Sequence, residues 1–114
     1  MGMGMKNSTK GTVVADHVRQ ATTFWQRLKG LLGTRLLPLG QGLIIKPCSS
    51  IHTFGMAYPI DVLFVDSAHC IIKIVDNMLP SKMSMASGSH YVVELPAGTA
   101  QRTACSVGDT VEFQ

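Results

Sequence analysis

The sequence predicts an α+β fold: a mainly antiparallel, curled or barrel-like sheet of five to six short strands, with one packed helix near residues 23–32. Two observations predict it. Apolar residues come in short runs bounded by Gly, Pro, Asn, Asp or Ser, which is typical of strands, and one segment changes to the helical period. A sheet of short strands protects its edges by curling, so a barrel-like form is favoured over a flat sheet.

The amino-terminal residues 1–10, MGMGMKNSTK, are polar or alternate Met with Gly, and they predict a flexible leader. Residues 11–114 are expected to form a single globular domain, because a chain of this length has room for one core. Within this domain, Thr12–Val18 is enriched in β-branched residues and predicts the first strand.

The predicted helix follows this strand. Thr23 and Gln26 form a capping-box pattern, and apolar residues then recur at helical spacing up to Leu32. Gly33 is expected to end the helix. Because a helix of about ten residues is marginal in isolation, its apolar face is expected to lie on the sheet.

Five further apolar runs predict the remaining strands: Leu43–Lys46, Asp61–Asp66, Cys70–Val75, Tyr91–Leu95 and Thr110–Phe113. The spacer Asp66–His69 is short enough for a hairpin between the second and third of these runs. The segments VLFV and IIKIV within them contain little that suits water, and both predict central strands. Residues 77–90 predict an exposed, mobile loop, and Ala97–Cys105 predicts one or two helical turns.

Composition excludes several functional classes. The apolar runs are far shorter than the roughly 20 residues that span a bilayer, and the amino end lacks a signal-peptide core, so we expect a cytoplasmic protein without membrane insertion. The ten Lys and Arg residues, which leave a net charge of +3, form no dense stripe with aromatics, so no nucleic acid is expected as a partner. Three widely spaced cysteines fit a reducing compartment.

Chemically varied side chains concentrate in PCSSIHTFGMAYPID, residues 47–61, between two apolar runs. A small core does not need a thiol, hydroxyls, an imidazole and a carboxylate in one short segment, so this segment is the predicted functional site. We expect a concave polar site that binds a small molecule or a peptide, with no cofactor and no metal. Its predicted members, including one rim cation, are Arg35, Cys48, Ser49, Ser50, His52, Thr53, Met56 and Asp61.

The alternative function is a thiol-dependent acyl-transfer or hydrolytic enzyme, with Cys48 as nucleophile, His52 as base and Asp61 as the group that orients the imidazole. A turn would bring Cys48 and His52 to roughly 6 Å or less, whereas an extended strand would hold them about 13 Å apart. Structural roles compete with this interpretation: a buried thiol, a core imidazole, and a carboxylate bound to backbone amides.

Three further alternatives have less support. A zinc site would need an unrecognised ligand spacing; its members would be Cys48, His52, His69 and Cys70. An interaction protein would offer its partner the loop of residues 77–90. Two sets have the every-second-residue thioether spacing that can hold copper(I): Met1, Met3 and Met5, and Met83 and Met85. No Cys or His accompanies either set in the sequence, so an ordinary structural role is favoured.

Four ordered blocks of the chain resemble the widespread prokaryotic family called domain of unknown function 192. They are RLKGLLGTRLL (Arg27–Leu37), GLIIKPCSSIHTFGMAYPIDVLFVD (Gly42–Asp66), VVELPAG (Val92–Gly98) and VGDTV (Val107–Val111). The resemblance covers residues 12–113 and implies a compact, mostly antiparallel β domain with a helix packed on it. It also implies that the positions of Phe54, Met56 and Asp61 are shared with relatives, whereas the Cys-Ser-Ser-Ile-His-Thr form belongs to one branch. A binding surface is therefore favoured over chemistry common to the family.

Overall fold

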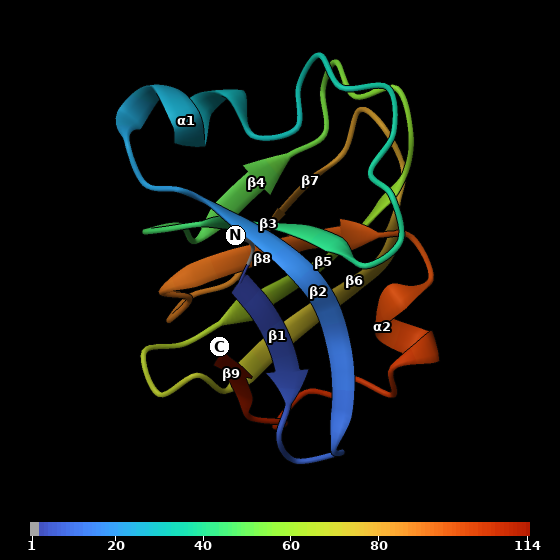
Figure 1. Cartoon of the computed structure of the whole chain (residues 1–114). Helices are drawn as coiled ribbons and strands as arrows, with labels where there is room; N and C mark the ends of the chain where they lie inside the picture. The colour runs from blue at the N-terminus through green and yellow to red at the C-terminus, as the bar shows by residue number, and fades with distance from the viewer. Residues whose placement is uncertain (1–2) are drawn as a thin grey trace.

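The computed structural model describes residues 3–114, which form a mainly-β fold around one curled sheet (Figure 1). Seven strands of the described chain make this sheet, in the order β6-β5-β8-β3-β2-β1-β9. Their bounds are β1 Met3–Asn7, β2 Thr12–Ala21, β3 Gln41–Ile45, β5 Ile60–Val65, β6 Ile71–Met78, β8 Tyr91–Pro96 and β9 Val111–Phe113. The strands β4 (Ser50–His52) and β7 (Met83–Met85) form a separate two-stranded sheet.

Helical structure is limited to two short elements of the described chain, α1 (Phe24–Lys29) and α2 (Thr99–Arg102). The fold is therefore mainly β rather than α+β, and its main sheet has seven strands rather than the five to six predicted. The helical turns predicted near the carboxyl end are confirmed by α2. Neither helix is long and apolar enough to cross a bilayer, a finding that covers the described residues.

The sheet curls until its two outer strands meet, as the predicted barrel-like form requires. An isolated antiparallel bridge pairs Cys70 with Thr110, next to the starts of β6 and β9. The Ile71 amide donates to the Asp109 carbonyl at 2.8 Å, and the Val111 amide donates to the His69 carbonyl at 2.9 Å. These bonds satisfy backbone groups that an open sheet edge would expose.

The amino-terminal segment differs from the prediction of a flexible leader. Met3–Asn7 forms β1, which pairs with β2 on one side and with β9 on the other. Met5 is 0% exposed, because alternate side chains of this strand face the core. Residues 1 and 2 of the predicted leader lie outside the described residues. The short Met-Gly alternation thus supplies a strand that closes the sheet.

The predicted capping box is confirmed at Thr23, whose hydroxyl accepts from the Gln26 amide at 3.1 Å. The helix α1 is shorter than predicted and ends at Gly30, not at Gly33. Gly30 has φ +49°, a conformation that side chains with a Cβ disfavour. The chain then turns inward, and Leu31 is buried under the helix end.

Two of the predicted strand assignments need correction. The hairpin through Asp66–His69 is confirmed, and β5 is a fully buried central strand, but β6 lies at one end of the strand order instead of in its centre. The segment 77–90, predicted as a loop, contains the end of β6 and all of β7, which pairs with β4. The position of β6 and the presence of β7 both depend on pairing between strands that are far apart in the sequence. Local periodicity does not show such pairing.

Apolar side chains form two clusters, one on each face of β8. Val93 and Leu95 belong to one cluster, and Val92 belongs to the other, as alternation along a strand requires. The same alternation places Glu94 on the face of Val92. A carboxyl group therefore occupies a position in the core where an apolar side chain would be expected.

Candidate functional site

A cleft of about 570 Å³ opens between α1 with the turn after it, the segment 47–52, and the strands β3 and β8. Figure 1 shows α1 beside β4 and β3, at the end of the molecule away from the turn between β1 and β2. Helix, loop and sheet thus each contribute one wall of this α1–β8 cleft.

Five of the predicted site residues line the α1–β8 cleft: Cys48, Ser49, Ser50, His52 and Met56. Three others do not line it: Arg35, Thr53 and Asp61. The sequence prediction therefore locates one wall of the cleft. It misses the polar groups that come from α1 and β8.

Glu94 is the most unusual residue of the cleft. It is 5% exposed and pairs across the sheet with Leu43 on β3 and Val62 on β5, both members of the apolar cluster. Its Oε1 atom has no hydrogen-bond partner in the protein. Burial raises the pKa of Glu94 to about 7, because a charged carboxylate is poorly solvated there.

The end of α1 covers this carboxyl group. A Cβ at Gly30 would lie 3.6 Å from Glu94 Oε1 and 3.7 Å from Ile45 Cδ1, so the helix end passes directly over both side chains. One signal in the sequence points to Glu94: it is the charged residue inside the apolar run YVVELP. Recognising it as a site residue requires knowing that α1 lies above it.

Arg27 contributes a second unpartnered polar group. Its Nη1 donates to the Pro47 carbonyl at 3.3 Å, which holds the guanidinium against the 47–52 segment. Its Nε is buried and has no hydrogen-bond partner in the protein. No ion pair joins Arg27 to Glu94 within the described chain. The cleft therefore offers one free donor and one free acceptor from opposite walls.

Cys48 carries a thiol that the surroundings keep neutral. Burial raises the pKa of Cys48 above its ordinary value, and the nearby charge of Glu94 raises it further, while Arg27 acts in the opposite direction. The Sγ donates to the Ser50 carbonyl at 3.2 Å. A nucleophilic cysteine needs a lowered pKa, so this environment does not activate the thiol.

The predicted Cys-His-Asp arrangement is not assembled. Asp61 is 0% exposed, and its two oxygens accept from the backbone amides of Asn77 and Ala100, each at 2.8 Å. His52 is exposed, and its Nδ1 accepts from the Phe54 amide at 3.2 Å. Asp61 thus braces β6 and α2 instead of orienting the His52 ring.

Thr53 also has a structural role, since its hydroxyl donates to the Leu79 carbonyl at 2.6 Å and accepts from the Lys82 amide at 2.9 Å. These bonds tie the end of β4 to the turn before β7. Arg35 is exposed on the segment between α1 and β3, away from the residues that line the cleft.

The alternative zinc set is likewise not brought together. His69 and Cys70 lie at the turn between β5 and β6, where His69 Nδ1 is 2.8 Å from the Tyr91 hydroxyl. In residues 3–114, no three His, Cys, Asp or Glu side chains are grouped so that they could hold a metal ion.

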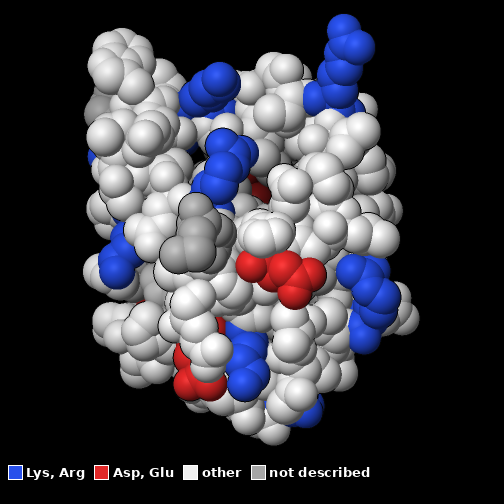
Figure 2. Space-filling view, in the orientation of Figure 1, with Lys and Arg blue, Asp and Glu red and all other residues white. Residues whose placement is uncertain are grey.

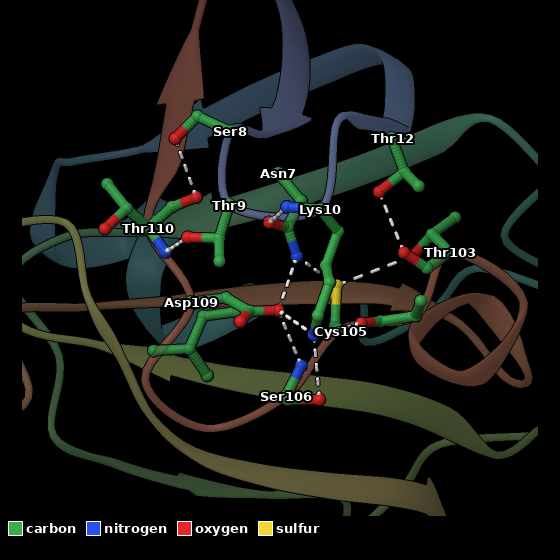
Figure 3. Close-up of polar contacts among 12 residues, drawn as sticks. Asn7, Ser8, Thr9, Lys10, Thr12, Thr103, Cys105, Ser106, Asp109 and Thr110 are labelled. Atoms are coloured by element: carbon green, nitrogen blue, oxygen red, sulfur yellow. Dashed lines mark hydrogen bonds and ion pairs between the residues drawn. The ribbon is translucent and has the colours of Figure 1, made fainter.

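A second polar cluster lies where β1 and β9 meet, and Figure 3 shows its contacts. Asp109 Oδ2 accepts from Asn7 Nδ2, Lys10 Nζ and the Ser106 amide, each at 2.9 Å. Lys10 Nζ also donates to the Ala104 carbonyl at 3.0 Å. These groups are satisfied by one another, so the cluster joins the two ends of the chain and offers nothing to a ligand.

Charged side chains show no comparable concentration on the surface that Figure 2 displays. Lys and Arg side chains are spread over this face, with acidic side chains between some of them. The α1–β8 cleft is therefore distinguished by buried unpartnered groups, not by a field of one sign.

The chain is similar in sequence to one protein family and in fold to two solved structures. Over residues 5–113, the chain matches the DUF192 family, described as Uncharacterized ACR. It is 29% identical to a "UPF0127 protein" of Thermococcus sibiricus, over 95% of this chain and 73% of that protein.

Two solved structures share the fold. A protein of unknown function from Novosphingobium aromaticivorans has a TM-score of 0.83 and 25% identity, over 96% of this chain and 82% of that one. A Sinorhizobium meliloti protein, whose name proposes a transcription regulator, has a TM-score of 0.85 and 25% identity. The similarity covers 97% of this chain and 91% of that one. The family match spans nearly the whole chain, and it confirms the resemblance found in the four sequence blocks. The chain belongs to the domain of unknown function 192 family.

Proposed function

We propose that the chain is a binding module that holds a small organic molecule in the α1–β8 cleft. The observation that carries this proposal is the Oε1 atom of Glu94, which is buried in the cleft wall without a partner. Arg27 is the second anchor, and the hydroxyls of the 47–52 segment supply further polar contacts.

The energetics favour a ligand at this position. A buried polar atom without a hydrogen bond costs about 1–3 kcal/mol of stability, and an apolar side chain at position 94 would avoid that cost. A ligand that donates a hydrogen bond to Glu94 Oε1 would recover part of it. Part of the free energy lost because this group is unsatisfied would therefore be regained when a ligand binds, and it would add to the affinity.

The shape and lining of the cleft fit a small molecule. Its volume of about 570 Å³ falls within the roughly 300–1,000 Å³ typical of ligand pockets. Apolar walls from Leu31, Ile45 and Met56 would contact the body of the molecule, while Glu94 and Arg27 would fix its polar end. A ligand that carries a donor for Glu94 and an acceptor for Arg27, such as a primary amide, offers the groups that these two anchors need.

A thiol enzyme is less well supported, because Asp61 is engaged elsewhere and the Cys48 thiol is neutral. The name of the Sinorhizobium protein suggests a regulatory role for that protein. On the face that Figure 2 displays, basic side chains are spread out, which favours a small ligand over a nucleic acid.

A thermal-shift screen of small primary amides, amines, alcohols and carboxylic acids tests the proposal. A true ligand should stabilise the protein by about 2.7 kcal/mol at a hundred times its dissociation constant. The Glu94→Leu variant should be at least as stable as the wild type without ligand, yet lose the ligand effect, because it removes the anchor and adds apolar surface. The matched control is Asp66→Leu, which removes a carboxylate outside the cleft and should keep the ligand effect. A compound that stabilises wild type and Glu94→Leu equally would contradict the proposal.

A further inference from the structure

The two-stranded sheet of β4 and β7 brings together side chains that are far apart in the sequence. In its antiparallel register, His52 lies opposite Met83, and Ser50 lies opposite Met85. Directly opposed residues project from the same face of a sheet, as do residues two apart along one strand. One face of this ribbon therefore carries an imidazole and two thioethers.

This face is turned to solvent. Met83 is 69% exposed and Met85 is 68% exposed, and His52 is exposed as well. The residues between them, Ile51 and Ser84, project from the other face, where Ile51 is buried. The two methionines therefore contribute little to the core, in contrast to the buried Met5 and Met78.

We propose that this face binds a monovalent soft metal ion, copper(I), through the sulfur atoms of Met83 and Met85 and Nε2 of His52. Thioether sulfur is a soft ligand that selects copper(I), and imidazole is a common partner for copper. Cross-strand neighbours have Cβ atoms about 4.5–5.5 Å apart, a separation that unbranched Met side chains can close around one ion. The pairing of β4 with β7 supplies the His that the Met83-Ser84-Met85 segment lacks in sequence.

Binding requires a change of tautomer at His52 but no net transfer of protons or electrons. Nδ1 accepts from the Phe54 amide, so the proton of the neutral ring lies on Nε2. When Nε2 bonds to the metal, this proton leaves and Nδ1 takes one from solvent. The Phe54 amide loses an exposed bond of 3.2 Å, which water replaces. The oxidation state of the metal is unchanged.

This site is distinct from the α1–β8 cleft. Met83 and Met85 do not line the cleft, whereas Glu94 lines it and belongs to β8, not to the β4–β7 ribbon. Substitution of Met83 therefore tests the metal site alone, and substitution of Glu94 tests the cleft alone. His52 is the residue that the two sites share.

Titration with silver(I) nitrate in chloride-free buffer tests this proposal, with the methionine methyl groups labelled with carbon-13 and followed by NMR. The chain carries Cys48→Ser, Cys70→Ser and Cys105→Ser, because free thiols would compete for silver. We expect the methyl signals of Met83 and Met85 to shift together and to saturate at one equivalent. The half-buried Met56 and the buried Met78 should not shift.

Substitutions separate a built site from general thioether binding. Met83→Leu and Met85→Leu should each weaken silver binding by at least about tenfold, the loss that even an outer-shell partner of a metal site causes. His52→Asn should weaken silver binding to a similar extent. The asparagine Oδ1 still accepts from the Phe54 amide, but the shorter side chain cannot reach the ion. Met56→Leu is the control and should leave the affinity unchanged.

A second measurement avoids the cysteine substitutions. The wild-type chain is equilibrated with copper(I) against a bathocuproine competitor, and Met83→Leu/Met85→Leu should bind one equivalent less than wild type. The proposal is overturned if this difference is absent. It is also overturned if silver shifts the half-buried Met3 and Met56 as much as Met83 and Met85, or if His52→Asn binds silver as tightly as its parent.

Discussion

Two groups of buried acidic side chains in this protein differ in what surrounds them. Asp61 and Asp109 lie where distant segments meet, and each accepts two or more hydrogen bonds from the protein. Glu94 lies in a cleft wall, and its Oε1 accepts none. A satisfied carboxylate stabilises the fold, whereas the unsatisfied carboxyl group of Glu94 is the anchor of the proposed ligand site.

The same difference appears in the direction of the pKa shifts. Burial alone would raise the pKa of Asp109, but hydrogen bonds from Asn7, Lys10 and Ser106 outweigh it and hold that pKa below its usual value. No such bonds offset burial at Glu94, whose pKa rises to about 7. The two carboxyl groups should therefore make stability depend on pH in opposite directions.

The largest effect is expected from Asp61→Ala. The substitution leaves the buried amide of Ala100 and the part-buried amide of Asn77 without an acceptor, and about 1–3 kcal/mol for each gives a loss of roughly 4 kcal/mol. Urea denaturation measures this loss. Asp66→Ala is the matched control, because Asp66 also accepts from two backbone amides but is only half-buried, so water can replace it. Equal losses for the two variants would refute the bracing role of Asp61.

A pH-dependent effect of about 3 kcal/mol is expected from Glu94. Its pKa is raised from 4.5 to about 7 in the folded protein, so the folded state holds this proton more tightly than the unfolded state does. The stabilisation is full below pH 4.5 and is lost as the pH rises to about 7. Glu94→Gln should abolish this fall and be more stable than wild type at pH 8. Urea midpoints from pH 4 to pH 8 measure the difference, and parallel profiles for the two proteins would exclude it.

Asp109→Asn should cost less, about 2 kcal/mol, because its partners are partly exposed and can bond to water. The sign of its pH dependence is opposite to that of Glu94. Its pKa is lowered on folding, so its stabilisation is present above the unfolded pKa and is lost as the pH falls through the folded pKa. Unfolding free energies from pH 2 to pH 5 should therefore converge for wild type and Asp109→Asn at the acid end. Lys10→Met is the control that removes the charged partner alone.

Local sequence patterns predict the elements that are determined by residues close together in the sequence. The capping box at Thr23, the hairpin after β5 and the buried strand β5 are set by neighbouring residues, and all three are confirmed. Local patterns do not predict the strands β1, β4 and β7, because each is short and contains Met, Gly or Ser. They are held by partners far along the chain, which periodicity does not report.

The candidate site shows the same limit. The 47–61 segment was predicted as polar and functional, and five of its residues do line the cleft. Asp61 belongs to the same segment, but its place on β5 carries it away toward Asn77 and Ala100. The sequence predicts Glu94 only as part of an apolar strand, because its lack of a partner depends on where α1 ends.

The smallest effect is expected on the pKa of the Cys48 thiol, which responds to the charges in the cleft without any change in the fold. The charge of Glu94 raises the pKa of Cys48 and that of Arg27 lowers it, so Glu94→Gln should shift the thiol titration to lower pH and Arg27→Gln to higher pH. The alkylation rate of Cys48 against pH measures this, in a chain with Cys70→Ser and Cys105→Ser. His52→Ala should change the profile little, because His52 bonds to the Phe54 amide and not to the thiol. A thiol that titrates well below ~8.5 and depends on His52 would instead favour the thiol enzyme, since only a nearby imidazolium would explain it.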